Sequence, residues 1–488
     1  MTAFNPAAFA ALIALVGLVI LMAGLLSGGA ERVGVPMVAL FIALGTLLGP
    51  HGLGLIDFGT GSPTLGAIAT LSLVLVLFTD AVAVNPAEVR AHLRIASIVL
   101  GPGTLLSAAL TAVAAWKLLD LPPAAAAILG AALASTDPVM MRGLLRLAEV
   151  PSAARNALKI ESGLNDVVLL PIVLVAMTFL AAGGGPTRGE IGRVLGAVFL
   201  LGPLAGAVVG WVAIRALVWV RGWMGMRRDY ESLYVLGIAF TAYAAAEALG
   251  ASGFMAAFAA GLAVATLDVE LCDCFHDYGE ATAEMLLLLS FIAFGASLIW
   301  TGLTVLSGRT LLLAAVALLG RSLVLELALP RAGIDPVARR LIVWFGPRGL
   351  SSLLLVLLPV FAGIPGSERL FPVTALVVLL SIAGHGTMLV WATLGLKAHG
   401  EPAAARGADP RLPSAEAVSH PELITFEELE RLRTAGAPVR ILDVRTERGY
   451  ATAKLRAKGA IRLLPDRPVE SAAGLALPRE EWLVAYCS

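Results

Sequence analysis

The sequence predicts an all-α polytopic membrane protein with about thirteen transmembrane helices, followed by a small soluble α/β tail. Of the 488 residues, 58% are hydrophobic and 14% are charged, unlike an ordinary soluble protein. The charges are missing from several long stretches, namely residues 1–30, 33–56, 58–79, 95–116, 285–308 and 370–396. A helix needs roughly 20 apolar residues to cross ~30 Å of hydrocarbon. These stretches therefore argue against a large soluble protein with buried helices.

The expected spans are separated by short charged or Gly/Pro-rich joints. They lie near residues 7–27, 33–50, 64–84, 94–116, 121–147, 153–182, 191–220, 230–249, 251–267, 281–303, 309–329, 337–361 and 370–396. No basic leader precedes the first apolar run, so residues 7–27 are expected to be a retained span rather than a cleaved signal.

Lys and Arg concentrate in every second joint, for example at residues 142–159 and 221–228. Under the positive-inside rule these joints face the cytoplasm, which places the N-terminus outside and the C-terminal tail in the cytoplasm. A bacterial-type inner membrane is the expected location. The net charge is zero, with 35 basic and 35 acidic residues, so nothing indicates a nucleic-acid partner.

The fifth span contains a helix breaker beside a carboxylate, Ser135-Thr136-Asp137-Pro138. Proline removes a backbone donor and disfavours helical geometry at the residue before it. A carboxylate and free carbonyl groups are therefore expected together within the membrane. Such interruptions survive in lipid only where they are buried in protein or line a cavity. This combination suits a hard monovalent cation, which prefers oxygen ligands.

The sixth span begins with a polar helical face. Glu161, Ser162, Asn165 and Asp166 are spaced so that they share one side of a helix. Ionisable groups inside spans are costly and are functional candidates by default. The face is expected to point into the protein, towards Asp137, although Glu161 could instead be an interfacial residue near Lys159.

Two arginines offer compensating charge. Arg321 lies in the eleventh span, where it could pair with Glu161 or with Glu326, and Glu161 is favoured. Arg348 lies in a second helix breaker, Gly346-Pro347-Arg348-Gly349, in the twelfth span. This breaker follows the first by seven spans, as expected of two inverted repeats. Paired broken helices in corresponding positions point to a transporter's binding site.

At these positions the chain resembles the monovalent cation:proton antiporters of the NhaP and Na⁺/H⁺-exchanger type, over residues 5–397. The stretches that carry the resemblance are Leu77-Phe78-Thr79-Asp80, Ser135-Thr136-Asp137-Pro138-Val139, Glu161-Ser162-Gly163-Leu164-Asn165-Asp166, Gly253-Phe254-Met255-Ala256, Phe294-Gly295-Ala296-Ser297-Leu298 and Trp344-Phe345-Gly346-Pro347-Arg348-Gly349. Gly163 and Pro347 depart from the usual pattern and could alter the size of the site and its choice of cation.

The resemblance implies a thirteen-helix, NhaA-like homodimer that works by alternating access, with crossed broken helices in spans five and twelve. It implies a site for the transported Na⁺, Li⁺ or K⁺ made by Asp137, Asp166, Ser162 and the Thr136 carbonyl, with Glu161 contributing directly or through water. The pair Asn165-Asp166 implies electroneutral one-for-one exchange and thus a role in pH homeostasis. No resident cofactor is expected.

The chemistry expected at the site is competition between a cation and a proton. Burial and nearby positive charge act in opposite directions on the ionisation of Asp137 and Asp166. Their balance could let the site hold either a proton or a cation near cytoplasmic pH.

The tail differs from the rest of the chain in amino-acid composition. Residues 398–419 are expected to be a linker rich in Ala, Pro and Gly, and residues 420–488 a soluble domain with a helix at 426–432 and strands at 439–444 and 482–486. Three stretches resemble a partial rhodanese-like domain: Ile441-Leu442-Asp443-Val444-Arg445, Gly459-Ala460-Ile461 and Val484-Ala485-Tyr486-Cys487. Because one residue follows Cys487, the segment is expected to be truncated or degenerate and non-catalytic, and a regulatory or redox-sensing role stays open.

Four alternatives remain open. A K⁺/H⁺ or Li⁺-preferring exchanger and an electrogenic exchanger fit the same carboxylates. A cation channel would not couple cation flux to protons. A membrane-tethered sulfurtransferase would need neither the many spans nor the buried acids. The sequence therefore favours a secondary transporter over an enzyme.

Overall fold

The computed structural model describes residues 17–25, 36–84, 93–145, 150–183, 185–224, 228–267, 269–329, 334–399, 426–434, 436–445, 450, 456–464, 472, 475 and 481–486. The chain divides into two compact units, residues 1–397 and 398–488. The expected first span, residues 7–27, is described only over residues 17–25, which are helical. The expected linker, residues 398–419, lies outside the described residues except for its first two positions.

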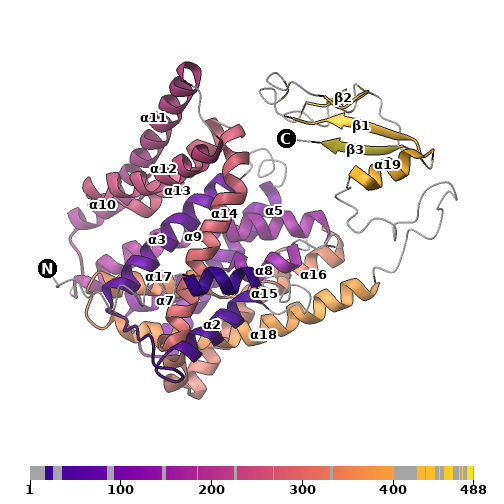
Figure 1. Ribbon diagram of the computed structural model, residues 1–488. Coiled ribbons are helices and arrows are strands. Elements are labelled where there is room, and N and C mark those ends of the chain that lie inside the picture. The colour runs from indigo at the N-terminus through magenta and orange to yellow at the C-terminus, as the bar shows by residue number, and fades with distance from the viewer. Residues whose placement is uncertain are drawn as a thin grey trace. The chain divides into compact units, whose positions relative to one another are not determined.

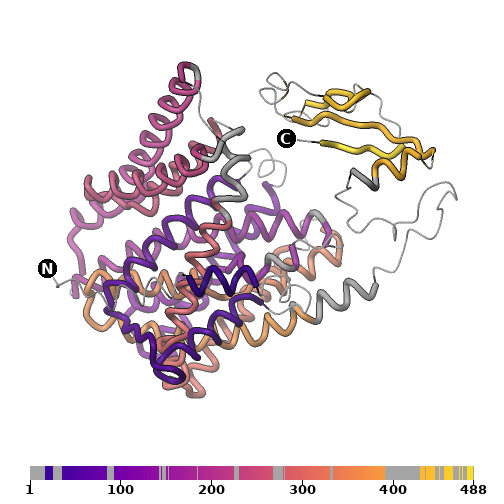
Figure 2. The backbone as a smooth tube through the Cα atoms, in the orientation of Figure 1, coloured from indigo at the N-terminus to yellow at the C-terminus, as the bar shows by residue number. Residues whose placement is uncertain are grey.

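The regular elements in the described part of the first unit are all helices, and Figure 2 traces the backbone. Its elements are α2 (Met37–Leu48), α3 (Pro63–Ala83), α5 (Leu93–Ile98), η1 (Val99–Leu106), α6 (Ser107–Leu118), α7 (Pro123–Ala134), α8 (Pro138–Leu145), α9 (Ser152–Ala181), α10 (Arg188–Gly196), η2 (Ala197–Leu201), α11 (Gly202–Trp223), α12 (Arg228–Ala248), α13 (Gly253–Leu267), α14 (Val269–Ala296), η3 (Leu298–Val305), α15 (Gly308–Ala328), α16 (Pro336–Trp344), α17 (Leu350–Phe361), η5 (Ser367–Arg369) and α18 (Leu370–His399).

Within the described residues, seven helical segments are long and apolar enough to cross a membrane, and an eighth is obtained if α14 and η3, bent by 50°, count as one span. The chain is therefore a multi-span membrane protein. Three further apolar helices, α2, α13 and α17, are shorter than a full span. The expected total of thirteen spans stays a prediction.

Both expected helix breaks are confirmed. The chain leaves α7 at Ala134 and resumes helix at Pro138, and it leaves α16 at Trp344 and resumes at Leu350. The two breaks touch each other, because the Asp137 backbone N–H donates to the Pro347 carbonyl at 2.9 Å. Four half-helix ends therefore meet inside the unit, and most residues of α7 and α17 are buried.

Neighbouring helices approach each other closely at glycine residues and at a pair of hydroxyl groups. A Cβ on Gly45 of α2 or on Gly295 of α14 would overlap the backbone of the opposite helix. The hydroxyl groups of Ser72 and Ser290 hydrogen-bond between α3 and α14 at 3.0 Å. Small residues that let backbones approach, with polar side chains paired between helices, are typical of helix packing in membranes.

The second unit contains α19 (Phe426–Thr434) and three strands, β1 (Val439–Asp443), β2 (Ile461–Arg462) and β3 (Trp482–Tyr486). The strands form a parallel sheet in the order β2-β1-β3, with Leu442 opposite Ile461 and Ala485 (Figure 1). The expected helix and both expected strands are confirmed. The tail is thus a small α/β unit, whereas its rhodanese-like character stays a prediction and Cys487 lies outside the described residues.

Candidate functional site

Asp137 lies where the two breaks cross and is 2% exposed. One carboxylate oxygen accepts the Val139 N–H at 2.8 Å, at the start of α8. The other accepts the Leu350 N–H at 2.9 Å, at the start of α17. The N-terminal ends of helices carry partial positive charge and unpaired N–H groups. Asp137 therefore caps two half-helices at once. These contacts explain how a buried carboxylate is stabilised at this position.

Arg348 lies at the opposite end of the first break. Its guanidinium donates to the carbonyl oxygens of Ala134 at 2.6 Å and Ser135 at 3.1 Å, where α7 ends, and its backbone N–H donates to Ser381 Oγ at 2.7 Å. C-terminal helix ends carry partial negative charge. Arg348 thus satisfies carbonyl groups that the break leaves without helical partners.

Arg321 does the same for the second break and also meets a carboxylate. It donates to the carbonyl oxygens of Val343 and Ile342, in the last turn of α16, at 3.1 and 3.0 Å. Its Nε donates to Glu161 Oε1 at 2.5 Å, and a second bond joins Nη2 to Oε2. Both side chains are about 2% exposed. The favoured pairing of Arg321 with Glu161 is confirmed, while Glu326 pairs at the surface with Arg339.

Asp166 lies on α9 against both breaks. Ser135 Oγ donates to Asp166 Oδ1 at 2.5 Å, and Ser351, in the first turn of α17, is a second hydroxyl partner. The negative charge of Asp137 acts on Asp166, so the two carboxylates share one buried environment. Two ionised carboxylates in one buried environment are costly unless a proton or a cation neutralises one of them.

Asn165 links α9 to the extended segment before Asp137. Its Nδ2 donates to Thr136 Oγ1 at 2.6 Å and, at 3.4 Å, to the Thr136 carbonyl. Among the described residues, Asn165 Oδ1 and Ser352 Oγ are buried without a hydrogen-bond partner. A buried polar atom without a hydrogen-bond partner is energetically costly. Each of these two oxygens could coordinate a cation or accept a hydrogen bond from a proton donor. The oxygens around Asp137 and Asp166 therefore fit a monovalent cation as cargo.

Ser162 is placed differently from the other expected ligands. It is buried, but its hydroxyl donates at 3.3 Å to the Lys159 carbonyl of its own helix. Beside it, a Cβ on Gly163 would lie 3.9 Å from the Cβ of Asp80 on α3. Asp80 thus flanks the polar face of α9. The structure brings together Thr136, Asn165, Asp137 and Asp166 most directly.

The glycines and the proline of the second break have defined roles. A Cβ on Gly349 would overlap the Asp137 carboxylate, and one on Gly346 would overlap the Arg321 guanidinium. Pro347 supplies the carbonyl that accepts the Asp137 N–H, a contact that needs no N–H of its own. The departure from the usual pattern at Pro347 is therefore compatible with the crossing.

Sequence reasoning missed four serines that complete the site. Ser135 and Ser351 contact Asp166, Ser352 is buried beside the second break, and Ser381 receives the Arg348 N–H. Ser351 and Ser352 follow Gly349 after one intervening residue, Leu350, so hydroxyl groups in the turn after a helix breaker were a usable signal. Ser381 lies on α18 with no local motif around it.

Comparisons with known proteins identify the family and the fold. The sequence profile described as the transmembrane sodium/hydrogen exchanger matches residues 17–395. The chain is 25% identical to the K⁺/H⁺ antiporter NhaP of Alkalimonas amylolytica over 73% of this chain and 62% of that protein. It is 28% identical to the K⁺/H⁺ antiporter NhaP2 of Shewanella sp. strain MR-4 over 75% of this chain and 64% of that protein. The match thus spans somewhat under two thirds of these relatives.

Solved structures show the same fold. The sodium proton antiporter MjNhaP1 of Methanocaldococcus jannaschii, at pH 8, superposes with a TM-score of 0.62 at 18% identity, covering 77% of this chain and 98% of that one. A second structure of the same antiporter gives a TM-score of 0.58 at 19% identity. On the profile match over residues 17–395, this chain belongs to the transmembrane sodium/hydrogen exchanger family.

Proposed function

We propose that this protein exchanges one monovalent cation for one proton by alternating access, with cation and proton competing for Asp137 and Asp166. The observation that carries the proposal is the meeting of these two carboxylates at the crossing of two broken helices. Helix ends and unwound carbonyl groups near the membrane midplane are the usual setting for transported ions.

The buried charges support a one-for-one stoichiometry. Asp137, Asp166 and Glu161 are negative when ionised, and Arg321 and Arg348 are positive, so the five groups together carry one excess negative charge. An uncompensated buried charge is expensive. A single proton or a single monovalent cation would remove the excess, and the two would then exclude each other. Asn165, which is neutral, adds no further charge.

The cation is proposed as Na⁺ or K⁺, with Li⁺ as a further substrate. The fold neighbour is named as a sodium proton antiporter, whereas the sequence relatives are named as K⁺/H⁺ antiporters. K⁺/H⁺ exchange is therefore a second candidate with direct support from the relatives. Both candidates use the same carboxylates and the same competition.

The remaining proposals concern assembly and placement. We propose a homodimer in a bacterial-type inner membrane, with the N-terminus outside and the tail in the cytoplasm as a rhodanese-like unit. The charge asymmetry of the joints supports the orientation. Cysteine accessibility on each side of intact cells tests the orientation, and mass measurement in detergent or bilayer discs tests the dimer.

The central test uses proteoliposomes containing a pH-sensitive dye, with the membrane potential clamped at zero. An imposed gradient of Na⁺, K⁺ or Li⁺ should drive protons uphill, which a channel cannot do, and the responding cation identifies the substrate. Asp166→Asn should abolish this flux while the protein still folds. Glu326→Gln is the matched control, because it removes a carboxylate of the surface pair on α15.

Undiminished cation-driven proton flux with Asp166→Asn would refute the assignment of this carboxylate. Flux that changes with membrane potential would refute the one-for-one stoichiometry.

A further inference from the structure

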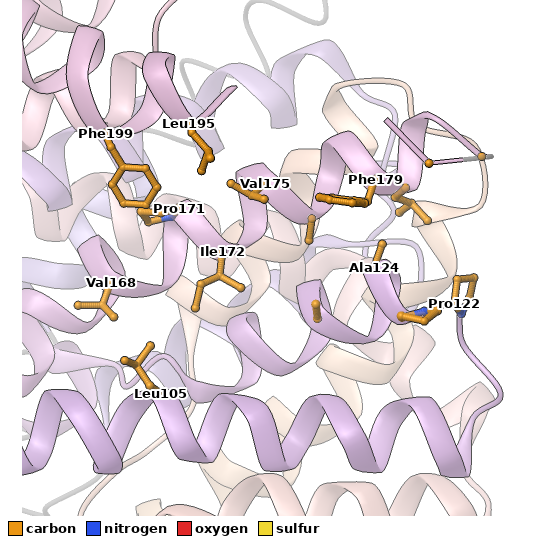
Figure 3. A pocket seen from close by; sticks show the side chains of 16 residues that line it. Leu105, Pro122, Ala124, Val168, Pro171, Ile172, Val175, Phe179, Leu195 and Phe199 are labelled. Carbon is orange, nitrogen blue, oxygen red and sulfur yellow. The ribbon is translucent and has the colours of Figure 1, made fainter. Parts of the chain in front are cut away.

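A large apolar groove opens beside the helix that carries Asp166. Its volume is about 840 Å³, within the usual range for ligand pockets of about 300–1,000 Å³. It is bounded by η1, the start of α7, one face of α9, the loop after α9, and the segment α10–η2 (Figure 3). The side chains that line it carry no charge and no hydrogen-bonding group. A polar or charged ligand would therefore lose its hydrogen bonds to water on entering.

The groove follows one face of α9 over a defined length. The lining residues of α9 recur with helical spacing, at Val168, Pro171, Ile172, Val175, Ala176, Phe179 and Leu180. From Val168 to Leu180 the helix rises roughly 18 Å at 1.5 Å per residue. One leaflet is half of a hydrocarbon core that is ~30 Å thick, or roughly 15 Å. The groove therefore has the length of an acyl chain in a single leaflet.

The rim of the groove is open. Leu105, Phe179, Leu195 and Phe199 are 40–58% exposed, and they belong to segments that cross the membrane. Figure 3 shows Leu195 and Phe199 on one side of the space and Leu105 on the other, with Ile172 and Val175 between them. A groove that opens between membrane-crossing segments faces hydrocarbon rather than water. A ligand would therefore enter it from the bilayer.

We propose that this groove is a specific site for one acyl chain of a bilayer phospholipid. Length, apolar lining and lateral opening each favour a single extended hydrocarbon chain. The site is distinct from the carboxylate site, because its lining on α9 begins at Val168, beyond Asp166, and includes none of the polar residues at the helix breaks. The proposal concerns binding and holds whether or not exchange occurs.

A consequence for transport rests on the proposed function. The groove separates α7 and α9, which carry the carboxylates, from α10 and η2, which continue into α11 and so pack against α13. Alternating access requires movement between the site and the rest of the unit. A chain seated between these two groups of helices would be displaced or compressed by that movement, so its loss should change the exchange rate.

The test uses the full chain in bilayers that contain a phospholipid with a photoreactive group on its acyl chain, followed by peptide mapping. Val175→Trp fills the groove from α9, and Val212→Trp is the control, because Val212 is exposed on α11 and does not line the groove. The expected result is labelling of peptides covering residues 168–180 and 195–199 several-fold above the peptide around Val212. Val175→Trp should lose this labelling and Val212→Trp should keep it.

Equal labelling of the groove and of the α11 surface in the unaltered protein would overturn the proposal, since it indicates ordinary boundary lipid only. This comparison uses only the unaltered protein, so it does not depend on whether a variant folds. Exchange measured in the same vesicles tests the consequence separately: a changed rate in Val175→Trp but not in Val212→Trp supports it, and equal rates overturn it. Failure of the proposed function itself would appear as absent exchange in the unaltered protein.

Discussion

The two helix breaks have separate partners at their C-terminal ends and a shared partner at their N-terminal ends. At the C-terminal ends, α7 has Arg348 and α16 has Arg321, so each break has its own arginine for the exposed carbonyl groups. At the N-terminal ends, α8 and α17 share one carboxylate, Asp137. The arginines also differ from each other: Arg321 has the carboxylate partner Glu161, whereas the described hydrogen bonds of the Arg348 side chain all go to carbonyl oxygens.

Under the proposed function, this difference separates structural charge from cargo-binding charge. Glu161 and Arg321 neutralise each other and hold α9, α15 and α16 together. Arg348 balances only one of the two remaining carboxylates, Asp137 and Asp166. The site is left one positive charge short, and that deficit is what a proton or a cation can fill. Removing a structural charge should therefore cost folding, while removing a cargo charge should cost transport.

The largest expected effect on stability is from breaking the structural pair. Glu161→Gln or Arg321→Gln leaves a buried charge without its partner, which lowers the free energy of unfolding by about 3–5 kcal/mol. The double variant removes both charges and should be more stable than either single variant. Thermal unfolding of the detergent-solubilised protein measures this. Arg339→Gln, in an exposed pair, is the control and should cost at most about 1 kcal/mol.

Additive losses in the double variant would contradict this division of charges. So would an Asp166→Asn variant that unfolds as readily as Glu161→Gln.

A smaller but still large effect is expected where the second break approaches Asp137. In Gly349→Ala, the new Cβ overlaps the Asp137 carboxylate and must push it away from the Leu350 N–H. Misplacement of a reacting group by about 1 Å can cost up to 10²-fold, so exchange should fall by about tenfold or more. Dye-based proton flux measures the change. In Gly384→Ala, on α18, the Cβ meets no atom within 4 Å, and exchange should be unchanged.

Gly163→Ala should have a milder effect and sharpens the comparison within α9. Its Cβ would meet Asp80 only at ordinary contact distance, 3.9 Å, and would displace no ligand. Exchange should stay within about twofold, since ordinary contact needs no rearrangement. The ratio of Na⁺ to K⁺ flux is the informative readout. A reversed preference would show that the space between α3 and α9 sets the choice of cation.

Much of this arrangement was predictable because membrane physics is strict. Uncharged runs located most helices, and Pro138 and Gly346 located both breaks. Asp137, Asn165 and Asp166 were predicted because polar groups inside spans need partners. The local sequence could not show that Asp137 caps α8 and α17 together, since that depends on a crossing of residues more than 200 positions apart. The local sequence also could not show that Ser381 on α18 accepts a hydrogen bond from Arg348. Ser162 was expected to be a ligand, but its hydroxyl bonds within its own helix.

A separate, local effect is expected in the tail, where a buried carboxylate has a different task. Asp443 accepts hydrogen bonds from Arg445 Nε at 2.8 Å and from the Tyr486 hydroxyl at 2.8 Å, which joins the ends of β1 and β3. These bonds, the one from Arg445 foremost, hold the pKa of Asp443 well below its usual range. A lowered folded-state pKa means that the stabilisation is complete above the unfolded carboxyl pKa, about 3.9, and declines as pH falls below it.

Asp443→Asn should therefore weaken the β1–β3 pairing at pH 7 by roughly 1.5–3 kcal/mol, the range for hydrogen bonds to charged groups. The difference from the unaltered protein should shrink at pH 3. Hydrogen exchange of the β1 and β3 peptides in the full chain, corrected for the intrinsic pH dependence, measures both. A difference that stays constant with pH would mean that shape rather than charge holds the two strands. Either result contrasts with Asp166, where loss of one carboxylate should leave the helices intact and remove the counter-charge for the transported ion.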